Sequence, residues 1–254
     1  WRPAGGPVEG ARDLMDIRLD QIFGRDVRFA QGDPRLDWRG LLSGEEASAA
    51  KATEKRRREF SAGRILGRRA MSELGFGAAP ILAGADRAPV WPAGVAGSIS
   101  HCEDWCIAAA ARLADGFLSI GVDIEPALSL DDDLVGDICG EDELAWLATQ
   151  PAPNRGMLAR AIFSAKECAY KCQYPLSRTL LDYHAMSVSI DLAASTFTAR
   201  FEVDAGPFRA GDRLEGRMSL DRDHIVTGMT LKKGRRFDEQ KLYAERASLI
   251  ASHA

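Results

Sequence analysis

The chain has no apolar run long enough to cross a membrane. A spanning helix takes about 18–20 consecutive apolar residues, and the longest stretch of small apolar residues, at 107–111, is far shorter. The first residues also lack the basic-then-apolar pattern of a secretory signal. We therefore expect a protein without membrane contact.

Cysteine is scarce, and its spacing does not indicate a zinc site. The 254 residues include five cysteines, an odd number that argues against a disulfide framework and favours the reducing cytoplasm. The C-x-x-C spacing of common zinc sites is missing. Cys168 and Cys172 would share a helix face and could ligate a metal, but free cysteine is more often a small buried apolar residue.

A large excess of one charge is also missing. The net charge is −4, and hydrophobic residues make up 46% of the chain. This composition allows one large domain or two small ones and does not favour a nucleic-acid partner. Seven basic residues between Lys55 and Arg69 nevertheless form a local cluster. It is either a solvated basic face or an anion-binding helix, since guanidinium groups suit phosphate.

The sequence twice shows a long segment of helix-forming residues followed by several strand-like runs. The first long helix is expected at 44–74, where Ser43 and Glu46 have capping-box spacing. Asp115-Gly116 is a hairpin turn signal between later strands. The expected strands of this part lie at 95–100, 105–112 and 117–125.

The second occurrence begins with an acidic, solvated stretch at 129–133 and a short helix at 141–149. A long helix follows at 156–174, ended by Pro175. Strands are expected at 185–191, 195–203, 213–221 and 224–232, and the tail at 235–254 as a peripheral helix or partly disordered. The repeated order predicts an α+β fold of two pseudo-symmetric halves, 1–125 and 126–254, each a long helix on a mainly antiparallel sheet.

Asp123 and Glu125 lie two apart on a predicted strand, so both carboxylates point to one face. Two such acids repel each other unless a cation lies between them. Mg²⁺ suits this geometry because it binds through one or two carboxylates together with phosphates and waters. A magnesium site and a strand end with solvated acids both remain open at this point.

Two more segments carry candidate binding side chains. Glu167 and Lys171 are spaced i,i+4 on the second long helix, which is usual for a surface ion pair. His101 follows Ser100 at the end of a predicted strand. A lone histidine is more often structural, but the hydroxyl-bearing, glycine-rich approach favours a phosphate or nucleotide contact.

Taken in order, four segments resemble the Sfp-type 4′-phosphopantetheinyl transferase family, and most closely its branch typified by enterobactin-synthetase component D. They are KRRREFSAGR at 55–64, RAPVWPAGVAGSISH at 87–101, GVDIE at 121–125 and FSAKECAYK at 163–171. The resemblance implies a holo-acyl-carrier-protein synthase-type enzyme. It would move the phosphopantetheine arm of coenzyme A onto a serine of an acyl, peptidyl or aryl carrier protein and release 3′,5′-ADP.

The resemblance also implies roles for single residues. Mg²⁺ would be held by Asp123, Glu125 and Glu167, in a cleft between the halves of a monomer. Lys171 would lie by the diphosphate and stabilise or protonate the departing 3′,5′-ADP. Either Glu167 or a Mg²⁺-bound water would take the serine proton. The 3′-phosphate and adenine end of coenzyme A would be held by Arg56, Arg64, Arg87, Ser100 and His101.

The sequence departs from the family pattern at two places. Phe163 stands where some relatives carry Trp, and the loop near Ala83 has no lysine, so Arg87 is the substitute candidate there. Residues 131–156 are a candidate docking element for the carrier, and the branch suggests siderophore, nonribosomal peptide or polyketide synthesis. Two alternatives are a Mg²⁺-dependent nucleotide phosphohydrolase and a non-catalytic carrier-binding module.

Overall fold

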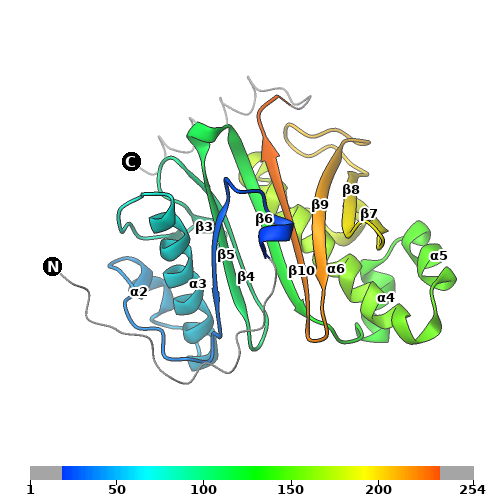
Figure 1. Cartoon of the computed structure of the whole chain (residues 1–254), viewed down its shortest axis with the longest axis horizontal. Coiled ribbons are helices and arrows are strands. Elements are labelled where there is room, and N and C mark those ends of the chain that lie inside the picture. The colour runs from blue at the N-terminus through cyan, green and yellow to red at the C-terminus, as the bar shows by residue number, and fades with distance from the viewer. Residues whose placement is uncertain (1–18, 235–254) are drawn as a thin grey trace.

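The computed structural model describes residues 19–234, which form two antiparallel sheets lying side by side (Figure 1). One sheet has the strand order β1-β5-β4 and the other the order β6-β10-β9-β8-β7; β2 and β3 form a separate small ribbon. The strands are β1 (Arg28–Gly32), β2 (Leu82–Ala83), β3 (Pro89–Val90), β4 (Val95–His101), β5 (Cys106–Arg112), β6 (Phe117–Pro126), β7 (Met186–Asp191), β8 (Thr196–Phe201), β9 (Arg213–Leu220) and β10 (His224–Lys232).

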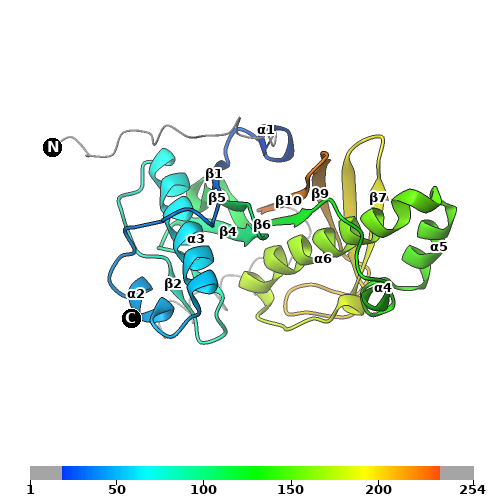
Figure 2. The same cartoon turned by 90° about the horizontal axis from the view of Figure 1, so that it is seen from below.

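Each sheet is covered by one long helix. Figure 2 shows α3 against the three-stranded sheet and α6 along the five-stranded sheet, with β4 and β6 meeting between the two helices. The helices are α1 (Leu19–Ile22), α2 (Glu45–Ala49), α3 (Glu54–Glu73), α4 (Asp132–Ile138), α5 (Glu141–Thr149) and α6 (Arg155–Ser177), with 3₁₀ turns at Leu113–Asp115, Ala152–Asn154 and Tyr183–Ala185. This mixed architecture confirms the predicted α+β class.

The two faces of β6 have different environments. Val122 and Ile124 are fully buried in a core that includes Leu19 and Val226. The alternate residues of β6 face α6, which lies unusually close to the strand. A Cβ added at Gly121 would lie only 2.1 Å from the carbonyl oxygen of Cys168, so glycine is required for this approach.

The first predicted helix is wrong in its length and its cap. Residues 44–74 form two helices rather than one, and α3 begins after Thr53, whose hydroxyl accepts a hydrogen bond from the Arg56 N–H at 3.3 Å. Gly44 caps α2 instead of Ser43. The fully buried Glu45 fixes the start of α2 by accepting the backbone N–H groups of Leu42 and Ile81, both at 2.8 Å, while Thr53 supplies a separate start for α3.

Three further local predictions need correction. Asp115-Gly116 is not a hairpin turn, because β5 and β6 belong to different sheets and Leu113–Asp115 forms a 3₁₀ turn before Gly116. Helix α6 continues through Pro175 to Ser177. Helix α4 begins inside the acidic stretch at 129–133, for which the sequence predicts no helix. The later strands and α5 agree with prediction, while the expectation for 235–254 falls outside the described residues.

The division of the chain into halves at 125/126 cuts through a hydrogen-bonded pair of strands. Strand β6, which this division places in the first half, pairs with β10 from Pro126 back to Phe117. The division itself stays a prediction. Within 19–234, no helix is both long and apolar enough to cross a membrane.

We predict that Lys166→Met lowers the free energy of unfolding by about 3–5 kcal/mol, because it leaves a buried charge unpaired. Lys166 Nζ lies 2.8 Å from Glu143, with both side chains at most 3% exposed. It also donates to the carbonyls of Ile138 and Tyr183 at 2.7 Å. Urea unfolding followed by circular dichroism measures the loss.

The control is Arg200→Met, which removes the cation of an exposed pair with Glu202 at 3.2 Å. Such a pair contributes less than about 1 kcal/mol. Equal losses in the two variants would contradict the importance of the buried pair.

Candidate active site

An open pocket lies where β4, β6 and α6 meet. Six of the residues singled out in the sequence line it together. They are Ser100, His101, Asp123, Glu125, Glu167 and Lys171, with Ile99 and Phe163 as apolar walls. The pocket thus brings together three segments that are far apart in the sequence.

Asp123 is the centre of the polar contacts in this pocket. Its Oδ1 accepts hydrogen bonds from Lys171 Nζ at 2.6 Å and from Ser100 Oγ at 2.8 Å. Its Oδ2 accepts one from Ser164 Oγ at 2.8 Å. Asp123 is only 2% exposed, and burying a carboxylate without such partners is costly. The side chain is therefore held by three partners from two elements, β4 and α6.

Two residues that hold this arrangement were missed in the sequence. Ser164 Oγ also lies 2.9 Å from Thr227 Oγ1, and Thr227 stands opposite Asp123 in the β6–β10 ladder. Ser164 belongs to the FSAKE segment, but no sequence pattern indicated that its hydroxyl would bind Asp123. Thr227 carried no signal at all, because its role depends on strand pairing.

Lys171 remains a cation in spite of its surroundings. Burial alone would lower its pKa, but the negative charges of Asp123 and Glu167 outweigh burial and raise the pKa. Lys171 Nζ also donates to Ser100 Oγ at 2.9 Å. The pocket therefore holds a fixed positive charge, which can bind an anionic group.

Glu125 and Glu167 are crowded acids. Burial, followed by the charge of Asp123, raises the pKa of Glu125 to about 7, although Arg160 Nη1 binds its Oε2 at 3.0 Å. Burial is also the main reason that the pKa of Glu167 is raised; Asp123 adds to the effect, and Lys171 opposes it. Tyr183 donates its hydroxyl to Glu167 Oε1 at 3.1 Å. Both carboxylates would gain from a nearby cation.

The donor set fits a hard divalent cation, since it consists of carboxylate oxygens around a pocket open to solvent. In the described part of the chain, the carboxylate oxygens of Asp123, Glu125 and Glu167 do not all come within 4.8 Å of one another. One oxygen of Asp123 is instead occupied by Lys171. The acids surround the pocket without yet converging on one point.

A second polar group lies at the edge of the pocket. Arg56 Nη1 donates to His101 Nε2 at 2.9 Å, and Glu59 lies 3.3 Å from Arg56 and 3.7 Å from His101. Burial lowers the pKa of His101; Glu59 opposes this shift, while Arg56 and Lys171 add to it. A neutral imidazole is therefore expected, with Arg56 as the exposed cation beside it.

None of the three predicted arginines lines the pocket, and Arg56 reaches it through His101. Arg64 is 6% exposed and stacks over Phe60 at 4.2 Å. Its Nε finds no hydrogen-bond partner in the described residues, and burial lowers its pKa to about 10. Arg87 lies in the loop between β2 and β3 with a left-handed φ of 66°. The neighbouring Asp86 fixes this loop to α6 by accepting the Tyr174 hydroxyl at 2.7 Å.

Comparison with known proteins gives a consistent result. The model of the 4′-phosphopantetheinyl transferase N-terminal domain matches residues 44–111, and that of the 4′-phosphopantetheinyl transferase superfamily matches 119–215. The chain is 38% identical over 195 residues to 4′-phosphopantetheinyl transferase Svp of Streptomyces mobaraensis, which covers 75% of this chain and 78% of the relative.

Two other relatives show similar identity. Transferase PptT of Mycobacterium tuberculosis is 32% identical over 197 residues, covering 75% of this chain and 86% of the relative. Enterobactin synthase component D of Escherichia coli is 37% identical over 169 residues, covering 65% of this chain and 79% of the relative. With two matching family models and relatives at this identity and coverage, the chain belongs to the 4′-phosphopantetheinyl transferase family.

Proposed function

We propose that the pocket between β4, β6 and α6 transfers the phosphopantetheine arm of coenzyme A to a serine of a carrier protein. The observation that carries this proposal is the convergence on Asp123: Lys171 at 2.6 Å and two further acids in the same pocket. Such a site combines a cation for a diphosphate with carboxylates for a metal ion. Coenzyme A is the phosphopantetheine donor that the family uses.

Coenzyme A would lie with its diphosphate beside Lys171. Its 3′-phosphate and adenine end would reach Ser100 and His101, which line the pocket, and Arg56, which donates to His101. Arg64 would contribute from α3, where its Nε is unpaired among the described residues. Arg87 would approach only from its loop, so we regard it as a contact for the outer part of the ligand.

Mg²⁺ would be held by Asp123, Glu125 and Glu167, and when bound it would neutralise the diphosphate and the charge that develops during transfer. The crowding that raises the pKa of Glu125 to about 7 supports this assignment, since a cation would relieve it. The three acids come from β6 and α6, which Gly121 allows to lie close together.

In the transfer, a bond forms between the carrier serine oxygen and the phosphorus that bears the pantetheine arm. The bond from that phosphorus to 3′,5′-ADP breaks. Glu167, one of the acids that line the pocket, would accept the serine proton. Tyr183 would orient Glu167 through its hydroxyl, and Lys171 would stabilise the departing phosphate.

The partner would be an acyl, peptidyl or aryl carrier protein of siderophore, nonribosomal peptide or polyketide synthesis. The named relative enterobactin synthase component D supports the siderophore assignment. Helices α4 and α5, with the exposed Leu134 and Leu144, would provide apolar docking surface.

We also propose that the fold consists of two pseudo-symmetric halves and that the protein is a monomer located in the cytoplasm. A nucleotide phosphohydrolase would instead consume coenzyme A without a carrier.

We predict that Asp123→Asn lowers the transfer rate at least about 100-fold, because it removes the charge that Lys171 and a metal ion share. Asparagine keeps the size of the side chain, so circular dichroism should show an intact fold. The assay measures the intact mass of an apo carrier protein after incubation with coenzyme A and Mg²⁺, where transfer adds one phosphopantetheine group.

Asp37→Asn is the matched control, because Asp37 is an exposed acid between β1 and α2, outside both the pocket and the proposed docking helices. It should transfer at the wild-type rate. Activity of Asp123→Asn within about tenfold of wild type would remove Asp123 from the site. Turnover of coenzyme A without a mass gain on any carrier would favour the phosphohydrolase.

We also predict that Arg56→Ala raises KM for coenzyme A about tenfold or more while changing kcat little, because one charge-assisted hydrogen bond is lost. Steady-state kinetics with varied coenzyme A measure both constants. Arg58→Ala is the control: Arg58 lies on the same helix and pairs with Glu54 at 3.6 Å, outside the pocket. An equal KM in all three proteins would show that α3 does not bind the ligand through Arg56.

A further inference from the structure

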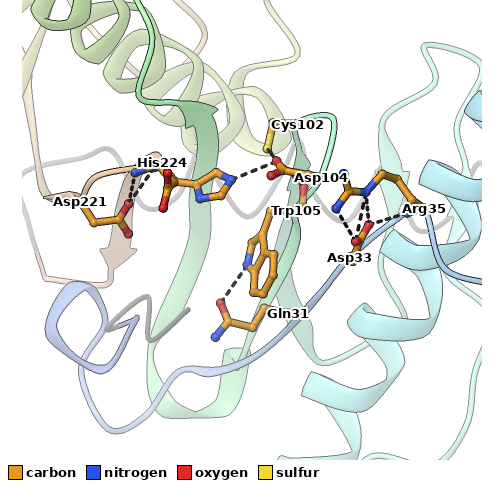
Figure 3. A network of polar contacts seen from close by, with 9 residues as sticks. Gln31, Asp33, Arg35, Cys102, Asp104, Trp105, Asp221 and His224 are labelled. Carbon is orange, nitrogen blue, oxygen red and sulfur yellow. Dashed lines mark hydrogen bonds and ion pairs between the residues drawn. The ribbon is translucent and has the colours of Figure 1, made fainter. Parts of the chain in front are cut away.

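A thiol, a carboxylate and an imidazole meet outside the pocket (Figure 3). Asp104 Oδ1 lies 3.3 Å from Cys102 Sγ and 3.0 Å from His224 Nε2. One ligand atom from each of these residues lies within 4.8 Å of the other two. No other three histidine, cysteine, aspartate or glutamate side chains within 19–234 converge so closely.

The imidazole is fixed in this position. His224 is 2% exposed, and its ring packs against Trp105 with centroids 6.1 Å apart. Its backbone N–H donates to Asp221 Oδ1 at 2.7 Å, and Trp105 Nε1 donates to Gln31 Oε1 at 3.2 Å. Figure 3 shows Nε2 pointing toward Asp104. Nδ1 has no hydrogen-bond partner among the described residues.

The cluster is accessible from solvent on its other side. The Asp104 side chain is 43% exposed, and Cys102 is partly exposed. Cys102 does not have the properties of a nucleophilic cysteine, because burial raises the pKa of its thiol to about 12. Nucleophilic cysteines instead have a lowered pKa. The position is thus open to a small ion, and a thiolate at Cys102 needs a bound cation beside it.

We propose that Cys102, Asp104 and His224 bind a divalent cation of the zinc type, with solvent in the fourth position. Sulfur, nitrogen and carboxylate oxygen are the ligands that zinc takes, and three of them with one open position are a common set. Tetrahedral bonds of about 2.0–2.3 Å place neighbouring ligands about 3.3–3.8 Å apart. The two separations from Asp104, 3.0 and 3.3 Å, need to lengthen by only a few tenths of an ångström, and the ligand atoms of Cys102 and His224 lie within 4.8 Å of each other.

The ion would take the place of the two protons that now bridge Asp104 to Cys102 Sγ and to His224 Nε2. Binding requires the thiolate, so the Cys102 proton is released to solvent, and His224 ligates through Nε2 with its proton on Nδ1. Histidine ligands usually donate the other N–H to a partner, and none is found here among the described residues. We therefore expect weaker binding than in a structural zinc site.

The site would join the two sheets. Cys102 and Asp104 lie in the turn between β4 and β5, whereas His224 is the first residue of β10. Cys102 directly follows His101, which lines the pocket. An ion here would fix the turn to the second sheet at the pocket edge. The sulfur ligand distinguishes this site from the magnesium site, whose ligands are all oxygens.

The test uses Co²⁺ and Zn²⁺ alone, without coenzyme A. Co²⁺ bound to Cys102 should give a thiolate-to-cobalt charge-transfer band that Zn²⁺ abolishes. Native alkylation gives a second readout, because Cys102 is the partly exposed cysteine while the other four are buried. Zn²⁺ should slow alkylation of Cys102 at least tenfold.

Asp104→Asn should weaken Co²⁺ binding at least tenfold, and Cys102→Ser should remove the charge-transfer band. Glu103→Gln is the matched control, an exposed acid in the same turn, and should bind Co²⁺ like wild type. Asp104→Asn alters a partly exposed side chain, so its fold should survive. The proposal is overturned by a missing band, by a band that persists in Cys102→Ser, or by alkylation that Zn²⁺ leaves unchanged.

Discussion

The contact between Lys171 and Asp123, 2.6 Å long, joins the helix and the strand on which the pocket is built. A carboxylate that is only 2% exposed is costly unless cations and hydrogen bonds compensate for lost water. Here the compensation comes from Lys171 and from the hydroxyls of Ser100 and Ser164. The positions of β4, β6 and α6 are thus tied to one charge. Gly121 makes the arrangement possible by letting the helix backbone approach the strand.

The same pocket carries more acid than one lysine can balance. Glu125 and Glu167 both have a raised pKa, chiefly through burial, and Asp123 adds repulsion in each case. Such crowding costs stability in the free protein and persists only because the surrounding core is rigid. A site for a cation and a phosphorylated ligand has this character, since binding removes the repulsion that folding had to overcome.

Sequence reasoning succeeded where a local pattern decides the structure. Alternating strands such as β9, and the shared face of Asp123 and Glu125 on β6, were predictable because strand geometry has a fixed period. It failed where a distant partner decides. The position of α2 depends on the buried Glu45 reaching Ile81, and Thr227 supports Asp123 through Ser164 only because β6 and β10 pair. His224 and Asp104 are 120 residues apart, so no spacing indicated their contact.

The location of these polar groups follows from how the two sheets meet. Strands β4 and β6 are neighbours but belong to separate sheets, so no backbone ladder joins them. Side chains form the connection instead. Ser98 Oγ accepts the Val122 N–H at 3.1 Å, and Ser100 donates to Asp123. Buried backbone groups must find partners. A junction without a ladder therefore needs polar side chains, and the same side chains become available for ligands. The pocket lies at this junction, where no backbone hydrogen bonds of a ladder join β4 to β6. The Cys102 cluster likewise joins the two sheets through side chains, from the turn after β4 to the start of β10.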